Sequence, residues 1–157
     1  MTEEPDVAAV AAWTQPPAGR LIGRGHPAGD FLDAWDWLVV AEETGFLRVE
    51  AGLPDRVKNP RGQLFGGFTP TYVDLIAVRA GAERGQAGPR RWLATTNMRI
   101  DYFEPIVGPR FVLESRLEKK RGRTNFVSTR FFQGEDLAVF ALTTMREVAL
   151  DRPLGDA

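Results

Sequence analysis

The stretch FTPTYVDLIAVRAGAERG, residues 68–85, decides the fold. In it, Thr69 can cap a helix, Pro70 suits the first helical position, and Gly85 can end the helix. Apolar side chains cover most of the circumference: Tyr72, Val73, Leu75, Ile76, Ala77, Val78 and Ala80. A helix that is apolar on nearly every side is buried in a protein rather than laid on its surface. We therefore expect one central helix that the rest of the chain encloses.

The sequence on either side of this helix predicts a sheet of hairpins. Upstream, the apolar runs 35–41 and 46–53 flank a turn at Gly45, which indicates a hairpin. The first run is also compatible with a helix that ends at Leu38. Downstream, four strand-like stretches follow one another: RRWLATTNMRIDYF, RFVLESRLEKK, TNFVSTRFF and LAVFALTTMREV. One long helix with a sheet made of hairpins is typical of an α+β domain.

Alternation along these stretches predicts which side chains share a face of the sheet. In residues 90–103, one face carries Trp92, Ala94, Thr96, Met98, Ile100 and Tyr102, and the other carries Thr95, Asn97, Arg99 and Asp101. The stretch LAVFAL, residues 137–142, is apolar on both faces. This pattern predicts that another subunit covers the outer face of the sheet.

Length and composition restrict the classes of protein. With 157 residues and 43% hydrophobic content, the chain is long enough for one domain with a core. We expect a partly ordered N-terminal arm over residues 1–30, the domain over residues 31–149 and a short tail over residues 150–157. The formal net charge of -1 provides no general attraction to nucleic acid or to an anionic membrane.

Rare residue types exclude several chemistries. The sequence has no cysteine, so neither a disulfide nor a cysteine nucleophile is available. Its single histidine, His26, lies among glycines and before Pro27, where we expect an exposed loop. A zinc site would need mostly carboxylate ligands, so we expect no metal. No apolar run approaches the ~18 residues of a membrane span, and the basic start of a secretory signal is missing, so we expect a cytoplasmic protein.

A glycine pair precedes the helix in residues 59–74, which read NPRGQLFGGFTPTYVD. Backbone N–H groups at the start of a helix are unpaired and carry the positive end of its dipole. Glycine also lets a substrate approach the backbone closely. The amide of Gly66 is therefore a candidate donor to an oxyanion, supported by the amide of Gly67.

A single carboxylate, Asp74, lies inside the predicted helix. It shares a stripe with Ala77, Val78 and Gly81, where partial desolvation would make it a stronger base. The residues alone leave two interpretations open. Asp74 is either a catalytic group or one half of a structural salt bridge, for example with Arg99.

The order of these elements and motifs resembles the hotdog-fold acyl-CoA thioesterases of the phenylacetate-pathway and 4-hydroxybenzoyl-CoA type. The family pattern is Asn, Gly, a hydrophobic residue, His-Gly-Gly and a later acid. Apart from the His, this chain matches it with Asn59, Gly62, Leu64, Phe65-Gly66-Gly67 and Asp74. Residues 93–147 resemble the second half of the family, with Tyr-x-x-Pro at a strand end and a basic turn. The resemblance covers residues 31–149 and implies an antiparallel sheet wrapped around one long central helix.

The resemblance implies roles for particular residues. It makes Asp74 the general base or the nucleophile, facing the thioester of a neighbouring subunit in a homodimer or homotetramer. Asn59 would help to hold the thioester or the attacking water, although an Asn before Pro60 also makes turns. Thr95 occupies the place of a hydroxyl that orients this water, although a Thr in a strand is commonly only a strand residue. We expect its neighbour Thr96 to be packed.

The implied substrate is an acyl-CoA, and no cofactor is expected beyond the coenzyme A of this substrate. The basic turn KKRGRT suits the phosphates of coenzyme A, although it is also typical of a solvated hairpin tip. The candidate phosphate contacts are Lys120, Arg121, Arg123 and, beside the glycine pair, Arg61. Apolar side chains expected to line an acyl pocket are Phe65, Phe68 and Tyr72.

The leading hypothesis is an acyl-CoA thioesterase that releases a carboxylic acid and free coenzyme A. Phe65 stands where the family commonly has His and cannot hydrogen-bond, which favours an alternative, a non-catalytic acyl-CoA or acyl-group binding protein on the same fold. A hydratase or dehydratase of this fold would rely on an active-site His, and His26 lies outside the matched region. A nucleic-acid binder is poorly supported because the basic turn lacks interleaved aromatic residues.

Overall fold

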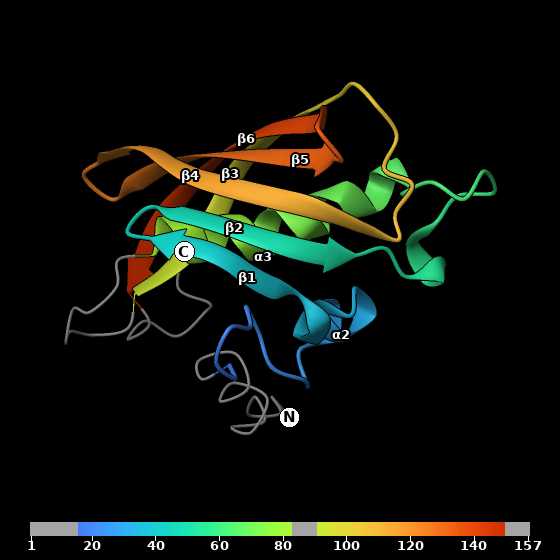
Figure 1. The fold of residues 1–157 in the computed structure, drawn as a ribbon. Helices are drawn as coiled ribbons and strands as arrows, with labels where there is room; N and C mark the ends of the chain where they lie inside the picture. The colour runs from blue at the N-terminus through green and yellow to red at the C-terminus, as the bar shows by residue number, and fades with distance from the viewer. Residues whose placement is uncertain (1–15, 83–90, 150–157) are drawn as a thin grey trace, which may run out of the picture.

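The computed structural model describes residues 16–82 and 91–149 of the chain. Six antiparallel strands form one sheet in the order β1-β2-β4-β5-β6-β3. Their bounds are β1 (Leu38–Glu43), β2 (Phe46–Gly52), β3 (Arg91–Tyr102), β4 (Arg110–Arg121), β5 (Thr124–Gln133) and β6 (Asp136–Ala149). Figure 1 shows the sheet curled around the long helix α3 (Thr69–Gly81). The expected α+β architecture is confirmed.

The predicted first hairpin is present. Strands β1 and β2 pair antiparallel, with Leu38 opposite Glu50 and Glu43 opposite Phe46. Gly45 closes the turn with a φ of 75°, a conformation that costs glycine little. The apolar run that was open to a helical interpretation begins with a 3₁₀ turn, Ala34–Asp36, and then continues as a strand.

Helix α3 begins differently from the prediction. A 3₁₀ turn, Gly66–Phe68, runs directly into it, so Thr69 is already helical, with a φ of -54°. Thr69 therefore cannot act as the cap, and the position before the helix is held by Phe68 without a side-chain cap. Pro70 lies in the first turn, as predicted, where its missing N–H removes no hydrogen bond within the helix.

The described part of α3 ends at Gly81, because Ala82 has an extended backbone with a ψ of 132°. This is earlier than the predicted end at Gly85, which itself lies outside the described residues. A Cβ on Gly81 would lie 3.1 Å from Cδ1 of Leu93, so the small residue lets the helix end approach β3. The side chain of Asn125 donates a hydrogen bond to the Gly81 carbonyl at 3.1 Å.

One side of α3 fills the core of the domain. Tyr72 is fully buried and stacks on Trp37, with ring centroids 5.3 Å apart and planes 9° from parallel. Its hydroxyl donates to the Gly52 carbonyl at 3.2 Å, and burial raises the pKa of the phenol above its usual value. Val73 and Ile76 are also fully buried. Tyr72 is therefore a core residue, and its expected place in an acyl pocket is wrong.

The opposite side of α3 is not covered by the sheet. Asp74, Leu75, Val78 and Arg79 are only half-buried. The prediction that the helix is enclosed on nearly every side is therefore correct only for the side of α3 that faces the core. The remaining stripe faces a groove between the start of β3 and residues near the N-terminus.

Residues 16–31 pack against the domain at the β1 edge. The backbone amide of Val39 donates to the Gly19 carbonyl at 2.9 Å, which extends the pairing of β1 by one short bridge. Leu21 and Ile22 are each 5% exposed and belong to the core. The short helix α2 (Pro27–Phe31) follows.

His26 is half-buried and caps α2, so the expectation of an exposed loop histidine is wrong. Its Nδ1 accepts a hydrogen bond from the amide of Gly29 at 2.8 Å. Burial lowers the pKa of the imidazole, although the charge of Asp30 acts in the opposite direction. The neutral ring is therefore the form that suits this cap, because a protonated Nδ1 cannot accept.

The outer face of the sheet carries exposed apolar side chains, including Val40, Leu142 and Val148. Of the helices in the described residues, none has the length and hydrophobicity needed to cross a membrane.

Candidate active site

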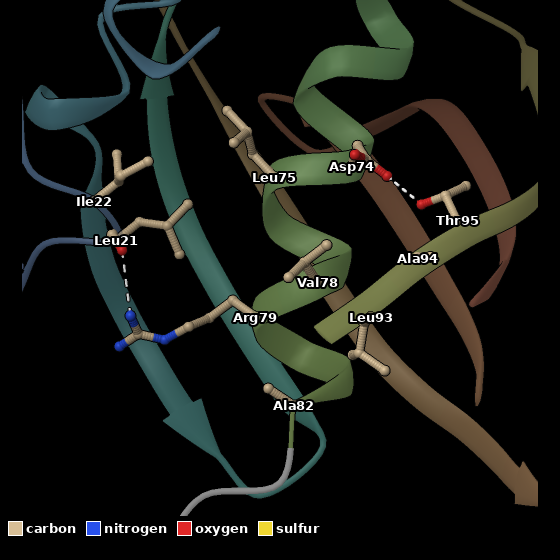
Figure 2. Close-up of a pocket in the computed structure, with 10 residues that line it drawn as sticks. All are labelled: Leu21, Ile22, Asp74, Leu75, Val78, Arg79, Ala82, Leu93, Ala94 and Thr95. Carbon is tan, nitrogen blue, oxygen red and sulfur yellow. Dashed lines mark hydrogen bonds between the residues drawn. The ribbon is translucent and has the colours of Figure 1, made fainter. Parts of the chain in front are cut away.

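A carboxylate and a hydroxyl meet on the open side of α3. Asp74 projects from the second turn of the helix, and Thr95 approaches it from β3 (Figure 2). The Thr95 hydroxyl donates to Oδ1 of Asp74 at 2.5 Å. Among the described residues, Thr95 is the only donor to this carboxylate, which leaves Oδ2 available to a water or a ligand.

A β-bulge brings Thr95 to this place. Thr95 pairs with Met145 and Asn97 pairs with Thr144, so Thr96 is an extra residue in β3. A bulge shifts the alternation of side chains by one position. Thr95 therefore lies on the helix side of the sheet, and so do residues further along β3, such as Met98, which packs on the core. The predicted separation of Thr95 from the face of Met98, Ile100 and Tyr102 is wrong for this reason.

Thr96, the extra residue of the bulge, is exposed rather than packed as expected. Its hydroxyl donates to the Thr144 carbonyl at 3.1 Å. Arg99 lies on the outer side of β3, is 74% exposed, and pairs with Asp101 at 3.2 Å. The proposed structural salt bridge between Arg99 and Asp74 is therefore wrong.

The Asp74–Thr95 pair lies in a groove of about 410 Å³. Helix α3 forms its floor, the start of β3 one wall and the segment containing Leu21 and Ile22 the other wall (Figure 2). The lining is mainly aliphatic: Leu21, Ile22, Leu75, Val78, Ala82, Leu93 and Ala94. Phe65 and Phe68, expected to line the acyl pocket, lie outside this groove.

The two glycines begin the 3₁₀ turn before α3. Among the described residues, neither the Gly66 amide nor the Gly67 amide donates a hydrogen bond. A Cβ on Gly66 would make only an ordinary contact, 3.6 Å from Cε1 of Tyr102. The fold of one chain thus does not demand glycine at this position. Glycine here suits the close approach of another molecule to the backbone.

Tyr102 and Phe65 both contact this turn. The Tyr102 hydroxyl donates to the Gly66 carbonyl at 2.8 Å and fixes that peptide plane, which also carries the Gly67 amide. Phe65 is 50% exposed, and Cε1 of its ring lies only 2.8 Å from the position that a Cβ on Gly67 would take. No local sequence pattern indicates the Tyr102 contact, because the glycine turn and the end of β3 are 36 residues apart.

Gly66 and Asp74 line different cavities of the chain. Gly66 lines a second cavity of about 240 Å³, together with Gln63, Thr69 and Tyr102. Along the helix, the seven residues from Gly67 to Asp74 span about 10 Å. This distance is too long for one carbonyl group to contact both the amides and the carboxylate of a single chain directly. The catalytic groups expected at one site are therefore not assembled by one chain.

Asn59 organises the loop before the glycines. Its Oδ1 accepts hydrogen bonds from the amides of Arg61 at 2.9 Å and Gln63 at 3.1 Å. Both lone pairs of this oxygen are thus occupied, and the turn-making interpretation describes the side chain well. A contact with a thioester would have to come from its amide nitrogen.

The predicted phosphate contacts are divided between the two ends of the molecule. Lys120 pairs with the buried carboxylate of Glu147 at 2.7 Å, whereas Arg121 and Arg123 are exposed on the hairpin turn. The loop that contains Arg61, residues 58–65, lies at the other end of the sheet (Figure 1). The twelve residues of β4 separate the two ends by about 40 Å. A single chain does not bring the four basic residues together.

Among the described residues, no three His, Cys, Asp or Glu side chains gather in a way that could hold a metal ion. Sequence reasoning also missed the part of the groove that comes from the N-terminal residues. Its one signal is the apolar pair Leu21-Ile22 within a stretch rich in glycine and proline.

Comparison with known proteins identifies the family. Residues 61–140 match the family model of the thioesterase superfamily. A search of curated proteins found no match. Among solved structures, the chain is similar to a mutant of a thioesterase from Pseudomonas aeruginosa, with 16% identity, a TM-score of 0.70 and coverage of 95% of this chain and 98% of that one.

Two further structures share the fold. A thioesterase from Haemophilus influenzae is 14% identical, with a TM-score of 0.69 and coverage of 81% of this chain and 86% of that one. A phenylacetic acid degradation-related protein from Ralstonia eutropha is 23% identical, with a TM-score of 0.63 and coverage of 76% and 89%. The expected hotdog fold, an antiparallel sheet around one long helix, is confirmed. The family model covers more than half of the sequence, and this chain belongs to the thioesterase superfamily.

Proposed function

We propose that the protein is an acyl-CoA thioesterase, which hydrolyses an acyl-CoA to a carboxylic acid and free coenzyme A. The observation that carries the proposal is the Asp74–Thr95 pair at 2.5 Å in an otherwise aliphatic groove. A lone carboxylate with one free oxygen beside an apolar cavity has the chemistry of a general base next to an acyl site. Membership of the thioesterase superfamily supports this assignment.

In the proposed reaction, Asp74 accepts a proton from a water molecule while the water oxygen bonds to the thioester carbonyl carbon. Thr95 holds Oδ1 and thereby directs Oδ2 toward that water. Amide donors stabilise the negative charge that develops on the carbonyl oxygen. The carbon–sulfur bond then breaks, and the proton passes to the sulfur of coenzyme A. Direct attack by Asp74, followed by hydrolysis of the anhydride, uses the same groups.

The site requires two copies of the chain in this proposal. One copy supplies Asp74 and Thr95, and its partner supplies the free amides of Gly66 and Gly67. The separation of these groups by about 10 Å along one helix supports a shared site. Strand β3 lies at an edge of the sheet, where a second copy can add its own strand. The apolar outer face offers a further contact for a homotetramer.

A shared site also changes which residues we expect to contact the phosphates of coenzyme A. Arg121 and Arg123 on one copy and Arg61 on the other are the proposed phosphate contacts, since all three are exposed. Lys120 is a weaker candidate because its ammonium group already pairs with Glu147.

A second function, binding of acyl-CoA without hydrolysis, is favoured by one observation. Phe65 lies against the Gly67 backbone and cannot offer the hydrogen bond of the family's His. Loss of the Asp74 carboxylate should reduce the rate of hydrolysis by an enzyme, whereas a binding protein should keep its affinity for acyl-CoA.

The test is release of free thiol from short, long and aromatic acyl-CoAs. Wild type should release thiol, and Asp74→Asn should reduce kcat by about 100-fold or more, as expected for loss of a general base. Asp101→Asn is the matched control, because Asp101 is a carboxylate of β3 that pairs with Arg99 on the outer side. Absence of thiol release from every substrate, with acyl-CoA still bound, would establish the binding function instead.

A further inference from the structure

The N-terminal residues build one wall of the groove. Leu21 and Ile22 face α3 across from Leu93, with Leu75 and Val78 between them (Figure 2). Each of the two wall residues is only 5% exposed. Their side chains are thus packed in place and bound the cavity that contains Asp74.

Arg79 fixes this wall to the helix and to β1. Its Nε donates to the Glu42 carboxylate at 3.0 Å, and its Nη1 donates to the Leu21 carbonyl at 3.2 Å. The two side chains of this ion pair are 27% and 16% exposed, so solvent screens the contact only in part. Arg20 adds a second anchor through a 2.9 Å hydrogen bond to the Asp36 carbonyl. The wall therefore has a fixed distance from the floor of the groove.

The groove has one polar end and one apolar end. Asp74 and Thr95 lie at one end, and Ala82 lies at the other, about 12 Å away along the helix (Figure 2). Arg79, the other charged residue of the lining, directs its guanidinium to Glu42 and Leu21. A carboxylate or hydroxyl on the far part of a ligand would therefore find no free side-chain donor among the described lining residues. An uncharged aliphatic chain would bury its surface there without such a cost.

We propose that this groove is the acyl subsite for an unsubstituted aliphatic chain, and that Leu21 and Ile22, positioned by Arg79, set the chain length it accepts. The inference rests on the proposed function in one respect, that the thioester lies at the Asp74–Thr95 end. It goes further by assigning the class of acyl group and the residues that select it.

Calorimetric titration with non-hydrolysable thioether analogues of acyl-CoA, in a series of increasing straight-chain length, tests the inference without hydrolysis. Affinity should rise about fourfold for each methylene until the groove is filled, and then level off. Ile22→Ala removes three carbons from the wall and should move the plateau to chains longer by about three methylenes. Arg79→Met should also move the plateau to longer chains, because the wall loses its hydrogen bond to the helix.

A variant with the opposite effect excludes general loosening of the fold as the cause. Val78→Phe adds volume to the floor and should move the plateau to shorter chains. Val107→Ala, which truncates a 48% exposed side chain outside the groove, should leave the plateau unchanged. The inference is overturned if wild type binds the series without dependence on length, or if neither Ile22→Ala nor Val78→Phe moves the plateau. A groove occupied by another segment or a second copy would give the first of these results.

Thiol release from the matching thioesters separates this inference from the proposed function. If the analogues bind with the expected shifts but the thioesters are not cleaved, the subsite stands and the thioesterase assignment fails. If the rate of thioester cleavage depends on chain length in the same way in wild type and in all variants, the thioesterase assignment stands and the subsite fails.

Discussion

At the residue scale, the site depends on one hydroxyl and one carboxylate. A hydrogen bond to a charged acceptor is stronger than one between neutral groups, and here it holds the acceptor in a single orientation. Thr95 and Thr96 are adjacent and chemically identical, yet only Thr95 contacts Asp74, whereas Thr96 contacts the Thr144 carbonyl. The two threonines therefore form a natural pair of test and control.

Thr95→Val should lower kcat by about tenfold or more, because a charge-assisted hydrogen bond worth about 1.5–3 kcal/mol is lost at Asp74. Thr95→Ser should retain most of the activity, since it keeps the hydroxyl. Thr96→Val serves as the control for loss of a threonine hydroxyl on the same strand. Steady-state kinetics would contradict the role of Thr95 if Thr95→Val and Thr96→Val were equally active.

Tyr102→Phe should reduce kcat roughly three- to tenfold with little change in KM, because the peptide plane that carries the Gly67 amide loses its anchor at the Gly66 carbonyl. Tyr102 is 54% exposed, so thermal stability should change little. A variant with wild-type kcat would show that the phenol does not position the donor.

At the element scale, periodicity predicted the central helix and the hairpins, because these are regular and mostly local. It failed where a single residue breaks the pattern. The bulge at Thr96 has no signature in composition, so the alternating pattern placed Thr95 on the wrong face relative to Met98. The cap at Thr69 failed because a 3₁₀ turn already precedes it. The wall of the groove depends on contacts of Arg79 with Leu21, 58 residues away, which no local pattern reveals.

The cap of α2 should make stability depend on pH. The pKa of folded His26 lies below the ordinary value of 6.5, so the unfolded chain binds more protons between the two values. Stability should therefore be fully present above about pH 6.5 and fall as the pH drops below it. His26→Asn keeps an acceptor for the Gly29 amide and should lose this pH-dependent part of the stability. Urea unfolding of both proteins across this range would refute the prediction if their midpoints fell in parallel.

At the scale of the whole molecule, the central feature is the division of functional groups. Asp74 lines one cavity and Gly66 lines another, and the basic residues lie at opposite ends of the sheet. The motifs of the family point to each group, and the shared site that we propose accounts for their separation in one chain. In the proposed dimer, two-fold symmetry provides two equivalent sites.

The most direct measurement is thiol release by mixed assemblies of Asp74→Asn and Gly66→Pro chains, co-expressed and purified through two different tags. Proline at position 66 removes the candidate donor, and the extended conformation of Phe65, with a ψ of 123°, is compatible with a following proline. Gly66→Ala, which keeps the amide, is the control for the side chain. Each variant alone should be nearly inactive, whereas the mixed dimer should regain about half of the wild-type kcat, because one of its two sites is intact. If the mixture stays as inactive as the separate variants while Gly66→Ala is active, the carboxylate and the amide donor do not act across two copies, and the shared site is contradicted.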